Sequence, residues 1–338
     1  MTAKRVTSVD VARHAGVSQA TVSRVFSNSD KVSPGTREKV MAAAHKLGYK
    51  PNVLARSLIT RRTNIIGFVM ADITSPFYPY VLEKFSQRLQ DEGRQVLLFN
   101  AAPGQSVDDL LPMALQYQVD ALIITSATLS SEMADECVRM GTPVILFNRY
   151  VVGAQASAVC CDNVKGGRLA ADLFLDTGHR RPAYIAGRPD TSTNTDREKG
   201  FTDRLRERGG TRWLREQGYY TYESGFDAAR RLLQRDDAPD AIFCANDIMA
   251  LGAMDAARHE LGISIPDALS VLGFDDIPAA DWPSYDLTTI RQPVNRMIDA
   301  TLDLLEERLA APEAEPVLEL IAGSLIRRSS VRLPEAIG

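Results

Sequence analysis

The chain has 338 residues, of which 45% are hydrophobic and 24% charged, so it can bury more than one core and should form at least two domains. No apolar run is long enough to cross a membrane, and the start of the chain lacks the apolar segment of a signal peptide. The four cysteines form no CxxC pair and have no histidine at metal-ligand spacing: Cys137, Cys160, Cys161 and Cys244. We therefore expect a cytoplasmic protein with reduced cysteines that uses neither a metal nor a cofactor.

The net charge of −4 hides an uneven distribution of charge along the chain. Residues 1–62 contain twelve basic and three acidic residues, a charge of +9, which leaves 27 basic and 40 acidic residues, a charge of −13, for the rest. A compact basic head on an acidic body is typical of a nucleic-acid-binding protein.

Two short helices are predicted at the start of the chain. The first has apolar residues at Val9, Ala12 and Ala15, a helical spacing, and Thr7 and Asp10 are placed to form its capping box.

Gly16 suits the tight turn that follows the first helix, because glycine accepts a positive φ. Ser18 then caps the second helix, whose buried stripe is Val22 and Val25. The residues left facing outward are Gln19, Ala20, Ser23 and Arg24. This pattern predicts a helix-turn-helix whose second helix enters the DNA major groove, where Arg and Gln can read base edges. The alternative is a solvated helical pair that binds nothing.

A third helix is expected to begin at Ser33–Pro34, an N-cap followed by the N1 proline, and to end at Gly48. Its apolar residues close a small core over the first two helices: Val40, Ala43, Ala44 and Leu47. Residues 51–62 offer only a short helix that should order when docked on a partner.

The motifs of this head resemble those of the lactose-repressor (LacI/GalR) family: Asp-Val-Ala, Ala-Gly-Val-Ser, Thr-Val-Ser-Arg-Val, Thr-Arg-Glu-Lys-Val and Tyr-x-Pro-Asn. The resemblance implies base contacts from Gln19, Ala20 and Arg24, although Ala20 departs from the long polar side chain of some members. It implies phosphate contacts from a second set: Ser18, Thr21, Ser23 and Thr36. Asn52 and Leu58 would belong to a hinge that pairs in the minor groove, with Leu58 as an apolar wedge.

After the head, apolar strands alternate with helices. The predicted strands are 65–70, 96–99, 121–125 and 144–147 in a first half and 158–161, 183–186, 241–244 and 270–273 in a second half. The predicted helices are 77–93, 107–116, 131–140, 166–176, 196–208, 225–234 and 247–259. Residues 287–292 should cross back to the first half, followed by a helix at 294–309 and strands near 316–321 and 325–328. Continuous apolar strands separated by helices indicate parallel sheets covered on both faces, and two such halves leave a crevice at the carboxyl ends of their strands.

The family's body resembles periplasmic sugar-binding proteins, and the motifs Thr-Gly-His-Arg and Gly-Phe-Asp-Asp-Ile extend the resemblance along the body. The expected fold is α/β: a small all-α helix-turn-helix headpiece plus a periplasmic-binding-protein-like (type I) body of two doubly wound parallel-sheet subdomains. The expected domains are a headpiece at 1–50, a hinge at 51–62 and an effector-binding and dimerisation core at 63–338. Within this core, the N-subdomain takes about 63–157 and 290–320, and the C-subdomain about 158–289 and 321–338.

Polar and aromatic residues near the strand ends are the candidates for binding an effector: Asp72, Phe77, Tyr78, Asn148, Arg149, Arg197, Tyr220, Asn246, Asp275 and Gln292. Carboxylates, amides and guanidinium groups next to aromatic rings suit a hydroxyl-rich ring. Arg197, Asn246 and Asp275 also match positions that the family uses for effector contact. The alternative for each is a structural cap or salt bridge, which we favour for Asp247 and Asp276. Trp213 is interpreted as a packing residue on a surface helix.

Two other functions fit the sequence less well. The sequence has no GxSxG, HExxH, P-loop or GxGxxG motif, and Asp275–Asp276 would suit glycoside hydrolysis only if both carboxylates faced one substrate. A transport protein would need a signal peptide and no DNA-binding head. The sequence therefore predicts a sugar-responsive transcriptional regulator that is not an enzyme and that binds a palindromic operator as a homodimer.

Overall fold

The computed structural model describes residues 6–26, 31–50, 62–71, 73–102, 105–125, 130–209 and 212–333. The chain forms two compact units, Met1–Thr63 and Asn64–Gly338, each with its own core. No helix among these residues combines the length and the apolarity needed to span a bilayer.

The first unit consists of α1 (Ser8–Ala15), α2 (Gln19–Phe26) and α3 (Pro34–Leu47). The predicted caps are confirmed: Thr7 and Asp10 form a capping box, the Ser33 side chain caps α3, and Gly16 and Gly48 have φ values of 68° and 65°.

The predicted core of this unit is confirmed except on α1. Val22 and Val25 of α2 pack against α3 side chains such as Val40. On α1, Val9 is 45% exposed and Val11 is fully buried instead. The helix is only eight residues long and contacts both other helices, so its buried stripe follows Val11 and Ala12 rather than the spacing that begins at Val9.

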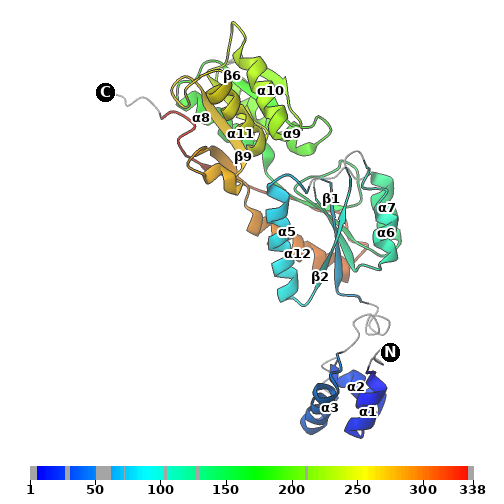
Figure 1. Cartoon of the computed structure of the whole chain (residues 1–338). Helices are drawn as coiled ribbons and strands as arrows, with labels where there is room; N and C mark the ends of the chain where they lie inside the picture. Colours follow the sequence, from blue (N-terminus) through cyan, green and yellow to red (C-terminus); the bar gives the residue numbers. More distant parts are fainter. Residues whose placement is uncertain are drawn as a thin grey trace. The chain divides into compact units, whose positions relative to one another are not determined.

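In the second unit, the first half is a six-stranded parallel sheet in the order β11-β5-β4-β3-β1-β2. Its strands are β1 (Ile65–Met70), β2 (Gln95–Asn100), β3 (Ala121–Thr125), β4 (Val144–Phe147), β5 (Ser157–Cys161) and β11 (Leu318–Ile321). Figure 1 shows α5 (Phe77–Asp91) and α12 (Val294–Ala310) on one face and α6 (Leu111–Gln116) and α7 (Ser131–Arg139) on the other.

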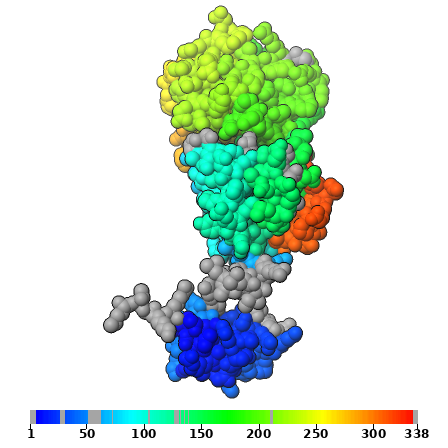
Figure 2. Space-filling view, turned by 90° about the vertical axis from the view of Figure 1, so that its right-hand side faces the viewer, coloured from blue at the N-terminus to red at the C-terminus, as the bar shows by residue number. Residues whose placement is uncertain are grey.

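Side chains alternate between these faces with the period of two that a strand imposes. Phe68 packs with Phe85 of α5, whereas Val69 belongs to the cluster of Leu111 and Ala134 from α6 and α7. Figure 2 shows late residues of the chain, in orange to red, against this cyan-to-green half.

The second half is another six-stranded sheet, in the order β12-β10-β9-β8-β6-β7, in which only β12 is antiparallel among the pairs described. Its strands are β6 (Pro182–Ala186), β7 (Leu214–Gln217), β8 (Ala241–Cys244), β9 (Ser270–Asp275), β10 (Thr288–Arg291) and β12 (Ser324–Ile326). The helices are α8 (Asn163–Asp176), α9 (Ser192–Glu207), α10 (Tyr222–Leu233) and α11 (Asp247–Asp255), which continues as a π-helical turn, Ala256–Glu260. Helices α8 and α9 pack together, as do α10 and α11.

Two boundaries of the expected subdomains are wrong. Residues 157–161 form β5, which pairs with β4 and β11 in the first sheet rather than opening the second half. Residues 288–291 form β10, which pairs with β9 and β12 in the second sheet. The chain therefore returns to the first half only after Arg291, and α12 then packs on β4 and β5.

Several local predictions also need correction. Trp213 is not on a helix: it directly precedes β7, and the Arg206 guanidinium lies 4.8 Å from the centroid of its ring. Strand β7 was not predicted because Leu214-Arg-Glu-Gln contains no apolar run. Helix α9 begins at Ser192, four residues earlier than predicted, because Thr191 is its N-cap and accepts a hydrogen bond from the Asn194 N–H. Helix α6 begins at Leu111 rather than at residue 107.

Candidate functional site

The second helix of the head presents a polar face. Gln19, Ala20, Ser23 and Arg24 are exposed, as the helix-turn-helix pattern predicts. The Ser18 Oγ accepts a hydrogen bond from the Thr21 N–H at 3.1 Å, and the two hydroxyls lie 2.9 Å apart. The Gln19 side chain donates to the Ser8 Oγ at 3.1 Å, so it reaches back across the turn.

The orientation of this helix is fixed by its neighbour α3. The Arg37 guanidinium donates to the Val25 carbonyl near the end of α2 at 3.1 Å. At the start of α3, the Thr36 N–H donates to the Ser33 Oγ. Asn52 and Leu58, the two candidates in the predicted hinge, lie outside the described residues.

In the second unit, a narrow cavity of about 20 Å³ lies between the two halves. Its walls are Ser75, Phe77, Tyr78, Asn148, Arg149, Thr193, Arg197, Tyr220, Asn246 and Asp275. We call this the central cleft. Its volume is that of about one water molecule, so a larger ligand requires its walls to move apart.

The structure brings eight of the ten predicted effector residues to the wall of the central cleft. Of the other two, Asp72 lies outside the described residues, and Gln292 stands behind the wall, where its Nε2 donates to Asp275 Oδ1 at 2.8 Å. Sequence reasoning missed Ser75 and Thr193. Short hydroxyl residues carry no distinctive signal, and Thr193 lies in the part of α9 that was not predicted as helix.

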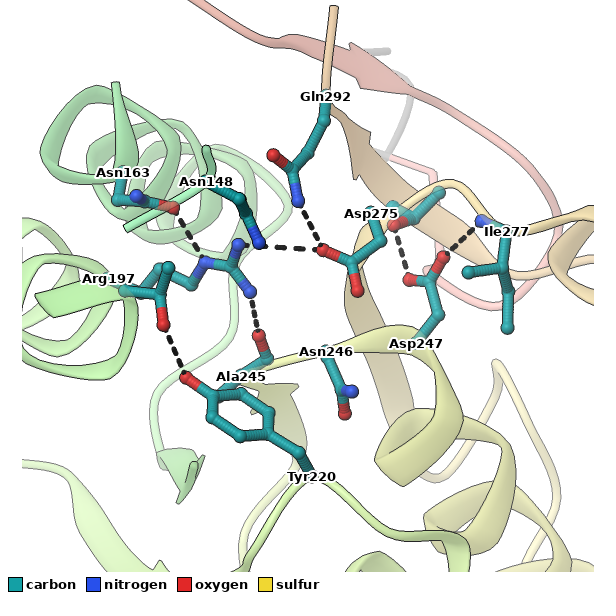
Figure 3. Close-up of polar contacts among 12 residues, drawn as sticks. Asn148, Asn163, Arg197, Tyr220, Ala245, Asn246, Asp247, Asp275, Ile277 and Gln292 are labelled. Carbon is teal, nitrogen blue, oxygen red and sulfur yellow. Dashed lines mark hydrogen bonds and ion pairs between the residues drawn. The ribbon is translucent and has the colours of Figure 1, made fainter. Parts of the chain in front are cut away.

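A buried cation and a buried anion form the floor of the central cleft (Figure 3). The Arg197 guanidinium donates to the Asn163 Oδ1 at 2.8 Å and to the Ala245 carbonyl at 2.5 Å, and it stands 3.5 Å from Asp275 Oδ1. It also lies 3.6 Å from the centroid of the Phe274 ring. All three nitrogen atoms of the Arg197 guanidinium thus have protein partners.

Burial raises the pKa of the Asp275 carboxyl, and the neighbouring Arg197 charge opposes that rise. Burial also raises the pKa of Asp247, and the nearby Asp275 charge raises it further. The two carboxyls therefore resist ionising together.

Asp247 and Asp276 do not line the central cleft, in agreement with a structural role, but neither is the cap of the next helix. Asp247 accepts hydrogen bonds from the Ile277 N–H at 2.9 Å and from the Thr289 hydroxyl. Asp276 pairs with Arg328 at 2.8 Å and with Arg291. The cap of α11 is Asn246, whose Oδ1 accepts from the Met249 N–H.

Polar atoms without a hydrogen-bond partner gather at this cleft. Among the described residues, four buried side-chain atoms lack a partner, and two of them belong to the cleft wall: Asn148 Oδ1 and Arg149 Nε. A third, Gln292 Oε1, lies behind the wall. A buried polar atom without a partner costs roughly 1–3 kcal/mol. One acceptor and one donor in the wall are therefore available to a ligand that carries both donors and acceptors.

The backbone at the cleft is also unusual. Asn148, Tyr220 and Asp275, each in the wall, have positive φ values of 69°, 66° and 125°. Such conformations cost of the order of 1–3 kcal/mol and cluster at binding sites. The Tyr220 ring fits only because residue 187 is glycine: a Cβ there would lie 2.1 Å from the ring.

A helix-turn-helix head joined to a two-part α/β body with a polar cleft defines a DNA-binding protein with a small-molecule site. The family model for bacterial regulatory proteins of the lacI family matches residues 7–52, and the model for a periplasmic binding protein-like domain matches residues 171–331. The HTH-type transcriptional regulator GalS of Salmonella typhimurium is 34% identical over 96% of this chain and 96% of its own. The regulator CelR of Thermobifida fusca is 34% identical over 97% of this chain and 98% of its own.

Solved structures agree. A lac repressor dimer bound to operator and the anti-inducer ONPF has a TM-score of 0.85 at 27% identity and covers 97% of this chain and 99% of its own. A complex of the regulator CelR with cellobiose has a TM-score of 0.72 at 33% identity and covers 96% and 100%. The chain belongs to the LacI family of bacterial regulatory proteins, as its motifs predict, and it is a DNA-binding transcriptional regulator.

Proposed function

We propose that the chain binds palindromic operator DNA as a homodimer and that a carbohydrate in the central cleft controls its affinity for the operator. The observation that supports the effector site is the pair of buried polar atoms without partners in the cleft wall, Asn148 Oδ1 and Arg149 Nε. Because these atoms include both a donor and an acceptor, they suit hydroxyl groups, which can donate and accept at once.

The DNA contacts are proposed on the exposed face of α2. Gln19, Ala20 and Arg24 face the bases, while the backbone phosphates are contacted by a second set: Ser18, Thr21, Ser23 and Thr36. The hinge proposal, with Asn52 and with Leu58 as a minor-groove wedge, rests on the family motifs alone. The solved lac repressor dimer on its operator supports the dimeric arrangement, and a regulator of bacterial genes acts in the cytoplasm. Light scattering of the purified chain tests the dimer.

The effector contacts are proposed for Phe77, Tyr78, Asn148, Arg149, Tyr220 and Asn246 in the wall, with Asp275 and Gln292 behind or beside them and Arg197 as their support. Asp72 stays a candidate from the sequence. That CelR was solved with cellobiose supports a carbohydrate as the class of effector.

The test combines a sugar screen with one variant. A sugar at 100 times its dissociation constant should raise the free energy of unfolding by about 2.7 kcal/mol, which thermal melting detects. In Arg149→Met the apolar stem remains and the unpartnered Nε is lost, so the affinity for that sugar should fall at least about tenfold. Operator affinity without sugar should stay unchanged.

Arg139→Met serves as the matched control, because Arg139 is an exposed arginine of α7 outside the central cleft. If no sugar shifts the melting temperature, the carbohydrate proposal is wrong. If both variants lose the same affinity, the cleft is not where the sugar binds.

A further inference from the structure

A second cavity adjoins the central cleft. It has a volume of about 370 Å³, and its walls include Arg149, Tyr150, Val151, Asp190, Thr195 and Asp196. We call it the side lobe. Its walls come from both halves of the body, since Tyr150 and Val151 follow β4 and the other side is the start of α9.

The two cavities share a wall. Arg149, with its unpartnered Nε, lines both of them. The Tyr220 hydroxyl contacts Thr193 of the central cleft at 3.0 Å and Thr191 of the side lobe at 3.3 Å. A ligand held by Arg149 in the central cleft therefore has a neighbouring space to extend into.

The volumes differ sharply. The central cleft has room for about one water molecule, whereas the side lobe at about 370 Å³ falls within the range of small-molecule sites, about 300–1,000 Å³. An effector that used only the central cleft would leave the larger space unused.

The chemistry of the side lobe suits a neutral, hydroxyl-rich ring. One part of the wall is apolar, with Ile124, Leu146 and Val151, and the opposite part carries the carboxylates of Asp190 and Asp196. An apolar wall can cover the C–H face of a sugar ring, while carboxylates accept hydrogen bonds from its hydroxyls. The charges here balance, because Arg149 stands in the same wall and Asp190 pairs with Arg188 at 3.2 Å. The side lobe therefore offers no excess positive charge to an anionic extension.

A polar contact across the side lobe joins the two halves. The Tyr150 hydroxyl donates to the Asp196 carboxylate at 3.0 Å, and the Tyr150 N–H donates to the Ser192 Oγ at 3.2 Å. A group bound here touches both halves at once, so its binding depends directly on the angle between them.

We propose that the effector is a neutral disaccharide whose first ring enters the central cleft and whose second ring occupies the side lobe. This inference rests on the proposed carbohydrate effector. It adds a second subsite, formed around Tyr150, Asp190 and Asp196, that selects two rings over one.

Calorimetry on the full chain tests it with matched sugars: glucose against cellobiose, maltose and trehalose, galactose against lactose and melibiose, and glucose 6-phosphate as the anionic probe. One disaccharide should bind at least about tenfold more tightly than its own monosaccharide, a difference of about 1.4 kcal/mol. Thr195→Trp, which fills the side lobe from an exposed position on α9, should abolish that difference and leave monosaccharide affinity within about twofold. Lys199→Trp, one turn further along the same helix and outside the side lobe, should preserve it.

Equal affinity for every disaccharide and its monosaccharide would overturn the proposed second subsite while leaving the proposed carbohydrate effector intact. So would an equal loss of both affinities in Thr195→Trp, or tighter binding of glucose 6-phosphate than of every disaccharide. Binding of no sugar at all would overturn the proposed effector class itself, and the subsite with it.

Discussion

Replacing Arg197 by methionine isolates the electrostatic role of the buried cation beneath the central cleft. Methionine keeps an apolar stem over the Phe274 ring but leaves Asp275 without its positive neighbour. Breaking a buried ion pair by removing one partner costs about 3–5 kcal/mol. At about 2 °C per kcal/mol for a body of this size, the melting temperature should fall by about 6–10 °C.

The loss of stability in the Arg197→Met variant should grow as the pH rises. Burial raises the pKa of Asp275 and Arg197 opposes that rise, so the Arg197→Met variant raises the pKa further. A carboxyl whose pKa is higher in the folded state than in the unfolded state stabilises the fold fully only below its unfolded pKa, about 3.9. That stability is lost as the pH rises through the folded pKa. The gap between wild type and variant should therefore widen as the pH rises from about 5.5 to about 8.5.

Scanning calorimetry across this range measures the gap, with the double variant Arg197→Met/Asp275→Asn as the control. Asparagine cannot ionise, and it has nearly the same shape as aspartate, so the double variant should recover part of the lost stability. Its deficit relative to wild type should no longer widen as the pH rises. A deficit that is constant with pH in the single variant, or strictly additive losses in the double, would refute the assignment of Asp275 as the uncompensated charge.

Three further changes test other parts of the molecule. Arg24→Ala should cost about 1–3 kcal/mol on the specific operator and much less on random DNA by fluorescence anisotropy; equal losses would make Arg24 a phosphate contact. Gly167→Ala should lower the melting temperature by several degrees, although alanine favours helix by about 1 kcal/mol, because its Cβ would lie 2.2 Å from the Arg197 carbonyl oxygen. Tyr150→Phe removes the hydroxyl that donates to Asp196 and so links the two halves. Small-angle scattering without sugar should then show a larger radius of gyration. An unchanged radius would mean that this hydrogen bond does not hold the halves together.

Much of the fold can be predicted from the sequence, because buried parallel strands appear in it as apolar runs and several helix ends are marked by capping residues. The errors have physical causes. The sequence wrongly predicts β5 in the second half, because no helix separates it from β4 and an apolar strand does not encode which sheet it will join. Strand β7 at Leu214–Gln217 is only partly buried, so it needs no apolar run and leaves no signal in the sequence.

The wall of the central cleft was predictable because the carboxyl ends of parallel strands meet at one edge of a sheet. What the sequence does not contain is how those side chains are paired. Arg197 and Asp275 look like two ligand contacts in the sequence, yet in the structure they engage each other and the protein. Conversely, the unpartnered atoms of Asn148, Arg149 and Gln292 become visible only when every neighbour is in place.

These unpartnered atoms bear on how an effector can control the head. A ligand shifts a conformational equilibrium only by the difference between its affinities for the two states. If Asn148 Oδ1 and Arg149 Nε in the wall of the central cleft each gain a partner, worth roughly 1–3 kcal/mol apiece, about 2–6 kcal/mol becomes available. Coupling free energies between sites are typically about 1–3 kcal/mol, so about half of that gain needs to differ between open and closed arrangements. Asn148 and Arg149 follow a strand of the first half, whereas Tyr220 and Asp275 belong to the second half. A ligand that bonds to Asn148 and Arg149 while it touches Tyr220 and Asp275 therefore sets the angle between the halves. Its free energy of binding depends on that angle for the same reason.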